Sequence, residues 1–391
     1  MRKQRWMLPD GVEEILPPHT WAVESLRRHL LDLFRGWGYD LIIPPLIEYL
    51  DSLLTGAGQD LDLQTFKLTD QLNGRMMGVR ADITPQAARI DAHILGGRGV
   101  RRLCYIGAVL HARPDAFGGS RIPLQVGAEL FGHSGPESDL EVLRLMIETT
   151  GKAAVTDLHL DLGHVGIYRT LVAQTNLSVE QEKALFIILQ RKSSHELNDL
   201  LTELRIPEAQ ALWFRGLIDL NGDDRVLDQA RLTLANAGNE VIEALDRLTW
   251  LVAQLRDHYP DLPVHLDLAE LRGYAYHTGV IFALFQPGRG WDLARGGRYD
   301  HVGEAFGQAR PATGFSTDLV ALLNSCGAQA DVISMPIRAP ALPDQDLRLF
   351  IEQLRQSGER VVQILPEQGQ ESADNSTDRR IVNRQGRWVV E

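Results

Sequence analysis

The order in which strand and helix patterns follow one another limits the folds open to this chain. Amphipathic stretches with helical spacing, such as residues 17–37 and 137–149, alternate unevenly with strand-like runs that end at proline or glycine. A parallel doubly wound sheet requires regular alternation of strands and helices, whereas an uneven order favours antiparallel pairing. We therefore predict an α+β fold in which helices flank an antiparallel sheet.

Local signals place the elements of this fold. Pro17-Pro18 opens the first helix and Gly36 ends it. Pro44-Pro45 confines the next strand to an edge or an interface, because proline donates no ladder hydrogen bond, and Asn73-Gly74 predicts a hairpin. The predicted strands are 38–48, 66–69, 76–80, 100–111, 122–131, 264–268 and 280–285, and a further helix is predicted over 84–95.

Residues 177–258 differ from the segments on either side because they are rich in Leu and Ala and carry few strand signals. This composition predicts a helical insertion that divides one domain into residues 1–176 and 259–326. Residues 327–391 are predicted to form a proline-punctuated linker and a small βαββ module. Its predicted elements are a helix over 347–356, a strand over 361–365, a polar loop over 367–377 and a strand pair around Gln385-Gly386.

Composition argues against several functional classes. A net charge of −12 and a pI near 5.5 oppose broad attraction to nucleic acid or to an anionic membrane. No apolar run approaches the ~18 residues of a spanning helix, and no leader pattern is present, so a cytoplasmic protein is expected. Cys104 and Cys326 have no CxxC partner, and His159 and His164 lack a third ligand at zinc spacing. Neither a disulfide framework nor a metal site is expected.

Four segments carry the strongest functional signal. They are Tyr105–His111, Gln125–Gly132, Leu271–Gly279 and Ala294–Asp300. Gln125 and Glu129 are four residues apart on a predicted strand, so both side chains point to one face and can enter one pocket. Two acceptors in one pocket suit an ammonium group.

These segments resemble the motifs of histidyl-tRNA synthetase, a class II aminoacyl-tRNA synthetase, and the resemblance covers about residues 5–325. It implies a class II synthetase-like sheet in residues 1–176 and 259–326. It also implies that Arg272 reaches a ligand carboxylate, for which a guanidinium fork is suited. The histidine-binding residues that the resemblance implies are Asp82, Thr84, Gln125, Glu129, Arg272, Tyr276 and His277.

Simpler roles for some of these residues stay open. Asp82 or Thr84 can cap the helix that begins beside them. Arg272 can form a surface ion pair. Tyr276 can belong, together with Tyr274, to one face of a half-buried strand.

Two positions depart from the synthetase pattern in a way that bears on catalysis. The synthetases use a motif 2 arginine to orient the α-phosphate and a motif 3 arginine to grip ATP, and the ungapped match puts His111 and Ala321 there. A methyl group cannot neutralise a triphosphate. Ala275 and His277 also replace the aspartate and a tyrosine of the family's histidine signature. We therefore predict no catalytic residue, no cofactor and no metal in this chain.

A synthetase-like chain without these arginines and with a short C-terminus resembles the ATP phosphoribosyltransferase regulatory subunits. That resemblance implies a non-catalytic partner of a short-form catalytic subunit in the first step of histidine biosynthesis, in a hetero-octamer with four of each subunit. It also implies feedback inhibition by L-histidine in the inherited pocket. Residues 45–48 resemble motif 1, the homodimer interface of class II synthetases, so a homodimer is expected within the complex.

Two alternatives from other functional classes remain. The first is an active histidyl-tRNA synthetase or a related ATP-dependent ligase, which the missing arginine at Ala321 and the short tail oppose. The second is a stand-alone histidine-sensing protein that binds some other partner. Pyrophosphate exchange with histidine would favour the first, and failure to co-purify with a catalytic phosphoribosyltransferase subunit would favour the second.

Overall fold

The structure of the chain, a computed structural model, describes residues 6–55, 59–114, 120–274, 276–307, 309–326, 335–365 and 379–391. The chain divides into two compact units, residues 1–328 and 329–391. Residues 327–334 of the predicted linker, the predicted polar loop over 367–377, and Ala275 lie outside the described residues. Within the described ranges, no helix is both long and apolar enough to cross a membrane.

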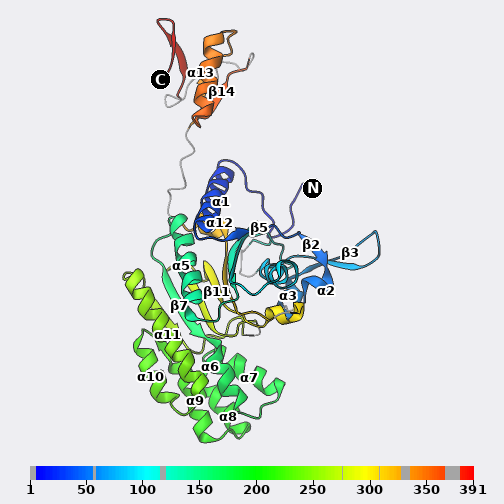
Figure 1. Cartoon of the computed structure of the whole chain (residues 1–391), viewed down its shortest axis with the longest axis vertical. Helices are drawn as coiled ribbons and strands as arrows, with labels where there is room; N and C mark the ends of the chain where they lie inside the picture. Colours follow the sequence, from blue (N-terminus) through cyan, green and yellow to red (C-terminus); the bar gives the residue numbers. More distant parts are fainter. Residues whose placement is uncertain are drawn as a thin grey trace, which may run out of the picture. The chain divides into compact units, whose positions relative to one another are not determined.

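A nine-stranded sheet forms the centre of the first unit (Figure 1). In spatial order its strands are β1 (Asp40–Leu41), β5 (Arg101–Ala108), β6 (Leu124–Phe131), β12 (Ala312–Asp318), β11 (Ala294–Arg298), β10 (Val280–Phe285), β7 (His159–His164), β9 (Val264–Asp267) and β8 (Asn221–Gly222). All pairs from β5 to β7 are antiparallel, which confirms the predicted antiparallel sheet. β1 pairs with β5 and β7 with β9 in parallel, and both pairs are joined by the long connections that parallel neighbours require.

Helices cover one face of this sheet. They are α1 (His19–Gly36), α5 (Pro136–Lys152), α11 (Asn239–His258) and α12 (Leu319–Leu323). The apolar stripe of α1 buries Leu30 and Phe34 in the same core as Val126 and Phe315 of the sheet, which confirms the predicted first helix. The rings of Phe34 and Phe315 meet edge-on with centroids 6.3 Å apart. The opposite face, where the candidate site lies, carries a second core cluster, in which Leu103, Tyr105 and Phe131 of the sheet pack with Ile83, Ala87 and Ala88.

The chain between β7 and β9 forms helices at one end of this unit, whereas α1 and α12 lie at the other end (Figure 1). These helices are α6 (Val165–Ala173), α7 (Val179–Gln190), α8 (Ser194–Glu203), α9 (Glu208–Asp219), α10 (Arg225–Thr233) and α11. Their buried leucines, among them Leu197 and Leu217, share one core cluster with the sheet, and β8 adds a short strand to its edge. The helices predicted within residues 177–258 are confirmed. The limits of these residues as a subdomain stay a prediction.

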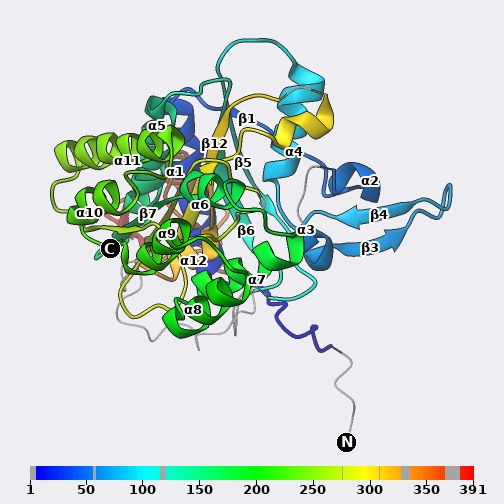
Figure 2. The same cartoon turned by 90° about the horizontal axis from the view of Figure 1, so that it is seen from below.

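A smaller sheet, which includes a long hairpin, projects from the same unit (Figure 2). Its strands are β2 (Ile47–Tyr49), β4 (Met76–Val79) and β3 (Phe66–Thr69), with α2 (Leu50–Leu53) and α3 (Gln59–Gln64) between β2 and β3. The hairpin predicted from Asn73-Gly74 is confirmed. The single strand predicted over 38–48 is wrong, because Pro44-Pro45 divides it into β1 and β2, which belong to different sheets.

The predicted helix over 84–95 is confirmed but changes character halfway. It begins as α4 (Thr84–Arg89) and continues as a π-helix, η1 (Ile90–Leu95). Its π segment contains the buried Asp91. A 3₁₀-helix, η2 (Val302–Phe306), precedes β12.

In its described residues, the second unit has one helix and four strands around a small core, among them the predicted helix, strand and strand pair. The helix and strands are β13 (Ile337–Ala339), α13 (Gln345–Gln356), β14 (Val361–Gln363), β15 (Ile381–Arg384) and β16 (Arg387–Val390). β13 falls where only linker was predicted, and it pairs in parallel with β14. Gln385 and Gly386, both at positive φ, form the two-residue turn between β15 and β16.

Candidate functional site

Glu129 lies at the centre of a buried polar cluster on the face of the nine-stranded sheet opposite α1 and α5, and its side chain is only 1% exposed. Tyr105 of β5 donates a hydrogen bond to Oε1 at 2.8 Å, and Tyr299, which follows β11, donates one to Oε2. Burial raises the pKa of both tyrosine hydroxyls well above its usual value, so they stay protonated at neutral pH. We call this group, with the residues described next, the Glu129 cluster.

Burial also raises the pKa of Glu129, to about 8, although the tyrosine donors oppose that shift. Burial therefore favours the protonated form of this carboxyl group at neutral pH. A cationic ligand beside it favours the ionised form, because an opposite charge lowers the pKa of a carboxyl group. Binding of a cation here is consequently linked to release of a proton.

Gln125, four residues before Glu129 on β6, holds Asp82 in the cluster. Its side-chain amide donates to Asp82 Oδ1 at 2.7 Å. The same oxygen accepts from the backbone N–H of Thr84 at 2.9 Å, and the Thr84 hydroxyl lies 2.9 Å from that of Tyr105. The structure thus brings together four of the predicted histidine-binding residues, Asp82, Thr84, Gln125 and Glu129. Neither Asp82 nor Thr84 is the N-cap of α4, because Ile83 holds that position without a side-chain cap, although Asp82 accepts from the first backbone N–H of the helix.

Two glycines make room for these side chains. A Cβ at Gly314 of β12, which pairs with Glu129, would overlap the Glu129 carboxylate. A Cβ at Gly127, between Gln125 and Glu129 on β6, would overlap the Tyr105 ring. The side chains of the cluster therefore lie directly on the sheet backbone.

Tyr276 and His277 approach the cluster from the segment between β9 and β10. The ring of Tyr276 packs on that of Tyr299 with centroids 4.9 Å apart, and its hydroxyl is buried without a hydrogen-bond partner in the described part of the chain. His277 meets Tyr276 edge-on at 5.4 Å, and burial lowers its pKa to about 4, so its imidazole is neutral at pH 7. These residues lie in a turn, so the alternative in which Tyr274 and Tyr276 share a strand face is wrong.

Arg272 lies on the same face of the sheet but makes its contacts outside the Glu129 cluster. Its guanidinium lies over the Phe285 ring of β10 at 5.5 Å and pairs with Glu270 at 2.8 Å and Asp292 at 3.8 Å. β10 is three strands from β6, a spacing of about 14 Å. The structure shows the ion pair that the sequence left open as an alternative, and it does not bring Arg272 to Glu129.

Neither of the two positions that lack the synthetase arginines holds a Lys or Arg, although Arg121 donates from Nε to the backbone carbonyl of His111 at 3.1 Å. His111 is buried, and its Nε2 lies 2.9 Å from the carbonyl oxygen of Ala81. Ala321 lies within α12. Arg113, two residues beyond His111, is exposed.

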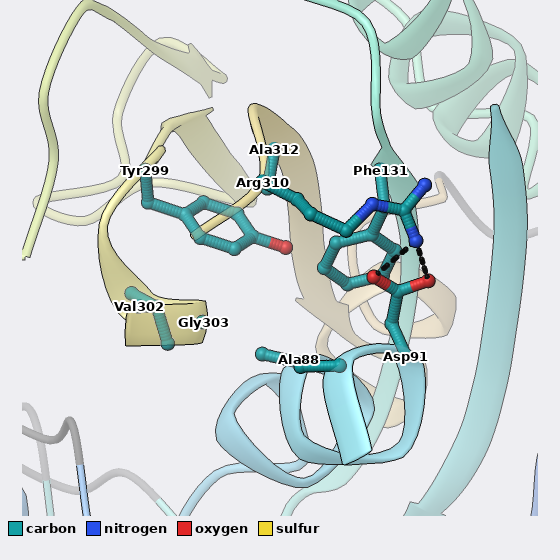
Figure 3. A pocket seen from close by; sticks show the side chains of 9 residues that line it. Ala88, Asp91, Phe131, Tyr299, Val302, Gly303, Arg310 and Ala312 are labelled. Atoms are coloured by element: carbon teal, nitrogen blue, oxygen red, sulfur yellow. Dashed lines mark hydrogen bonds and ion pairs between the residues drawn. The ribbon is translucent and has the colours of Figure 1, made fainter. Parts of the chain in front are cut away.

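A buried ion pair lies close to Tyr299 on the side of η1. Arg310 donates to both carboxylate oxygens of Asp91 at 2.8 Å (Figure 3). Arg101 also donates to one of these oxygens at 2.8 Å. Tyr299 and this pair line a cavity of about 10 Å³, which has room for about one water molecule. An amino acid does not fit in this cavity. The ion pair joins Asp91 of η1 to Arg310, two residues before β12, and so fixes η1 beside that strand. Among the described residues, no group of three or more His, Cys, Asp or Glu side chains is arranged to hold a metal ion.

Sequence analysis did not assign Tyr105 and Tyr299 to the site, although both lie in the quoted motifs. The signal for Tyr105 is its place opposite Gly127 in the β5–β6 ladder, where a large side chain can fill the space above a glycine. The signal for Tyr299 is weaker, because its approach to Glu129 depends on pairing between strands far apart in sequence.

Comparison with known proteins gives matches along almost the whole chain. A family model described as histidyl-tRNA synthetase matches residues 11–322, and one described as the C-terminal domain of ATP phosphoribosyltransferase subunit HisZ matches residues 334–391. The ATP phosphoribosyltransferase regulatory subunit of Thioalkalivibrio sulfidiphilus is 53% identical over 99% of this chain and 98% of its own length.

Solved structures agree with these matches. A protein from Bacillus halodurans, described as an ATP phosphoribosyltransferase regulatory subunit/histidyl-tRNA synthetase, has a TM-score of 0.82 at 25% identity, covering 96% of this chain and 97% of that one. A chain of the ATP phosphoribosyl transferase (HisG:HisZ) complex from Thermotoga maritima shares the fold, with a TM-score of 0.58 at 17% identity over 78% of this chain and 98% of that one. The chain therefore belongs to the family of ATP phosphoribosyltransferase regulatory subunits, the non-catalytic subunits of an enzyme complex with a class II synthetase-like fold.

Proposed function

We propose that this chain binds a short-form ATP phosphoribosyltransferase catalytic subunit, activates it, and inhibits it when free L-histidine occupies the Glu129 cluster. The complex would condense ATP with phosphoribosyl pyrophosphate in the first step of histidine biosynthesis, so histidine is the end product of its own pathway. The observation that carries the proposal is the buried set of acceptors around Glu129 in a chain similar over its full length to regulatory subunits.

The chemistry of histidine suits this set of side chains. Its ammonium group and its imidazole N–H are donors, and the carboxyl groups of Glu129 and Asp82 are acceptors. The buried Tyr276 hydroxyl, which has no partner among the described residues, supplies one more hydrogen bond. The ligand carboxylate requires a cation, and Arg272 can serve only if it leaves Glu270.

Loss of the nucleotide half of the site supports a regulatory role over a ligase. Formation of an adenylate requires preorganised cations where charge develops on phosphate, and neither His111 nor Ala321 supplies one. Residues 177–258 also carry fourteen Asp and Glu against nine Lys and Arg. That acidic balance opposes binding of an RNA backbone by the helical insertion.

The proposed homodimer is supported at the motif 1 segment. Glu48 accepts hydrogen bonds from Gln86 at 2.7 Å and Arg89 at 2.6 Å, so the end of this segment is fixed. Ile43, just before this segment, and Leu46, within it, are exposed apolar side chains of the kind that a second copy can cover. The four-plus-four complex follows from the family resemblance and belongs to the proposal.

Histidine can inhibit only if it binds the less active state of the complex more tightly than the active state. A tenfold difference in affinity corresponds to about 1.4 kcal/mol of coupling. By the same linkage, substrates that favour the active state weaken histidine binding by the same factor.

Turnover of a reconstituted complex tests the proposal. A tagged copy of the chain should retain a short-form catalytic subunit, and formation of phosphoribosyl-ATP should rise on mixing and fall when histidine is added. The Glu129→Gln complex should keep the activation and lose the response to histidine. Pyrophosphate exchange by the isolated chain with histidine and ATP, or absence of activation on mixing, contradicts the proposal.

A further inference from the structure

The segment that carries Tyr276 toward the Glu129 cluster also carries Tyr274 toward the helical insertion. The two tyrosines flank Ala275, which lies outside the described residues, and their contacts lie in different regions of the fold. Tyr276 packs on Tyr299, which donates to Glu129. Tyr274 packs between α6 and α7, with its ring 5.1 Å from that of Tyr168 and 5.5 Å from that of Phe186.

Polar contacts tie the Tyr274 side of this segment to the same two helices. The Tyr274 hydroxyl donates to Glu182 Oε1 of α7 at 2.6 Å. Arg169 of α6 lies over the Tyr274 ring at 4.4 Å and donates to the backbone carbonyls of Tyr274 and, at 3.0 Å, His277. One arginine therefore holds backbone on both sides of the turn, so a shift of Tyr276 is passed to α6 and α7.

The Tyr276 side provides a reason for such a shift. A buried hydroxyl without a hydrogen-bond partner among the described residues destabilises the conformation that holds it. A ligand that offers it a hydrogen bond relieves this destabilisation only in the bound state, and such a differential contact is what biases one conformation over another. We infer that Tyr274, held by Glu182 and Arg169, couples occupancy of the Glu129 cluster to the helical insertion. This inference rests on the proposed histidine site.

Amide hydrogen exchange of the full chain with and without L-histidine tests the coupling. In the wild type, histidine should slow exchange both in β6, beside Glu129, and in residues 165–190 of α6 and α7. Tyr274→Phe removes only the hydroxyl that bonds Glu182. It should leave the Kd for histidine within about threefold, as expected for one hydrogen bond outside the ligand contacts, and should reduce the added protection in 165–190, with Arg169 and the ring contacts carrying the remainder.

Tyr39→Phe is the matched control, because the Tyr39 hydroxyl likewise donates to a glutamate, Glu141 of α5, at 3.0 Å. It should leave the protection of 165–190 at the wild-type level. Equal protection of 165–190 in Tyr274→Phe and the wild type overturns the coupling, as does protection in the wild type that is confined to β6. Absence of any histidine binding to the wild type removes the proposed site as well, so the two failures are distinguishable.

Discussion

The Glu129 cluster and the Arg272 ion pairs lie on one face of one sheet, yet they differ in burial and in the partners they have without a ligand. Glu129 is 1% exposed, and hydroxyl donors already meet both of its carboxylate oxygens. The side chain of Arg272 is 50% exposed, and carboxylates of its own chain, Glu270 and Asp292, occupy its guanidinium. One half of the proposed pocket is assembled in advance, and the other half must change partners.

The two halves should therefore contribute differently to the free energy of ligand binding. Preorganised groups cost little reorganisation when a ligand arrives, so the Glu129 half should supply most of the affinity. The Arg272 half gains a ligand carboxylate but loses an intramolecular one, and exposed ion pairs contribute only about 0–1 kcal/mol each. Substitutions in the two halves should therefore differ in size.

The largest effect should come from Glu129→Gln. The variant removes the buried carboxyl group that ionises beside a cationic ligand, and loss of one partner of a buried charge pair costs about 3–5 kcal/mol. Histidine should bind at least about 100-fold more weakly by isothermal titration calorimetry. Glu141→Gln is the control and should change affinity little, because Glu141 of α5 likewise accepts a tyrosine hydrogen bond but lies on the other side of the sheet. A wild-type Kd in Glu129→Gln places the ligand elsewhere.

The next effect expected is a dependence of the stability of the fold on pH that comes from the Glu129 half of the pocket. The pKa of Glu129, raised to about 8, means that the folded chain keeps a proton that the unfolded chain releases above about pH 4.5. The contribution of Glu129 is then fully present at low pH and is lost as pH rises through 8. The melting temperature of the wild type relative to Glu129→Gln should fall from pH 5 to pH 8. A constant difference over that range would show that Glu129 titrates at its ordinary value.

Tyr299→Phe should lower the stability of the fold by a moderate amount. It removes a donor from a buried carboxyl group, so the free energy of unfolding should fall by about 1–3 kcal/mol. Tyr49→Phe is a useful comparison, because the Tyr49 hydroxyl accepts only an exposed hydrogen bond from Asn73, and its loss should cost less than about 0.5 kcal/mol. Chemical denaturation of both variants measures the difference. Equal losses of unfolding free energy in the two variants would show that the Tyr299–Glu129 hydrogen bond stabilises the fold no more than the exposed Tyr49–Asn73 bond does.

The same division explains how far the sequence alone could reach. Alternation along one strand places Gln125 and Glu129 on one face, and the structure confirms it, because strand period is a local property. Arg272 could not be placed in this way. Its position depends on competition between Glu270, two residues away, and Asp292, which the fold brings near it, and Glu270 makes the shorter contact. Tyr299 was missed for a related reason, since its contact joins residues 170 apart in sequence.

Arg272→Gln tests whether the arginine leaves its ion pairs for a ligand. If it does, histidine should bind about tenfold more weakly, as for loss of one charge-assisted contact. Histidinol, which lacks the carboxylate, should bind the variant and the wild type equally. Equal weakening of both ligands would mean that Arg272 supports the fold of the segment rather than the ligand carboxylate.

Glu270→Gln should give the smallest change, and in the opposite direction. Glu270 holds Arg272 through its backbone N–H at 2.7 Å and its guanidinium at 2.8 Å, so it competes with a ligand carboxylate for the same cation. A neutral amide keeps the backbone contact and weakens the competition, which should tighten histidine binding about threefold, within the range of an exposed ion pair. Glu180→Gln, on the exposed first turn of α7, should leave the Kd unchanged. Weaker binding in Glu270→Gln would mean that the glutamate positions Arg272 for the ligand, and both halves of the pocket would then be assembled in advance.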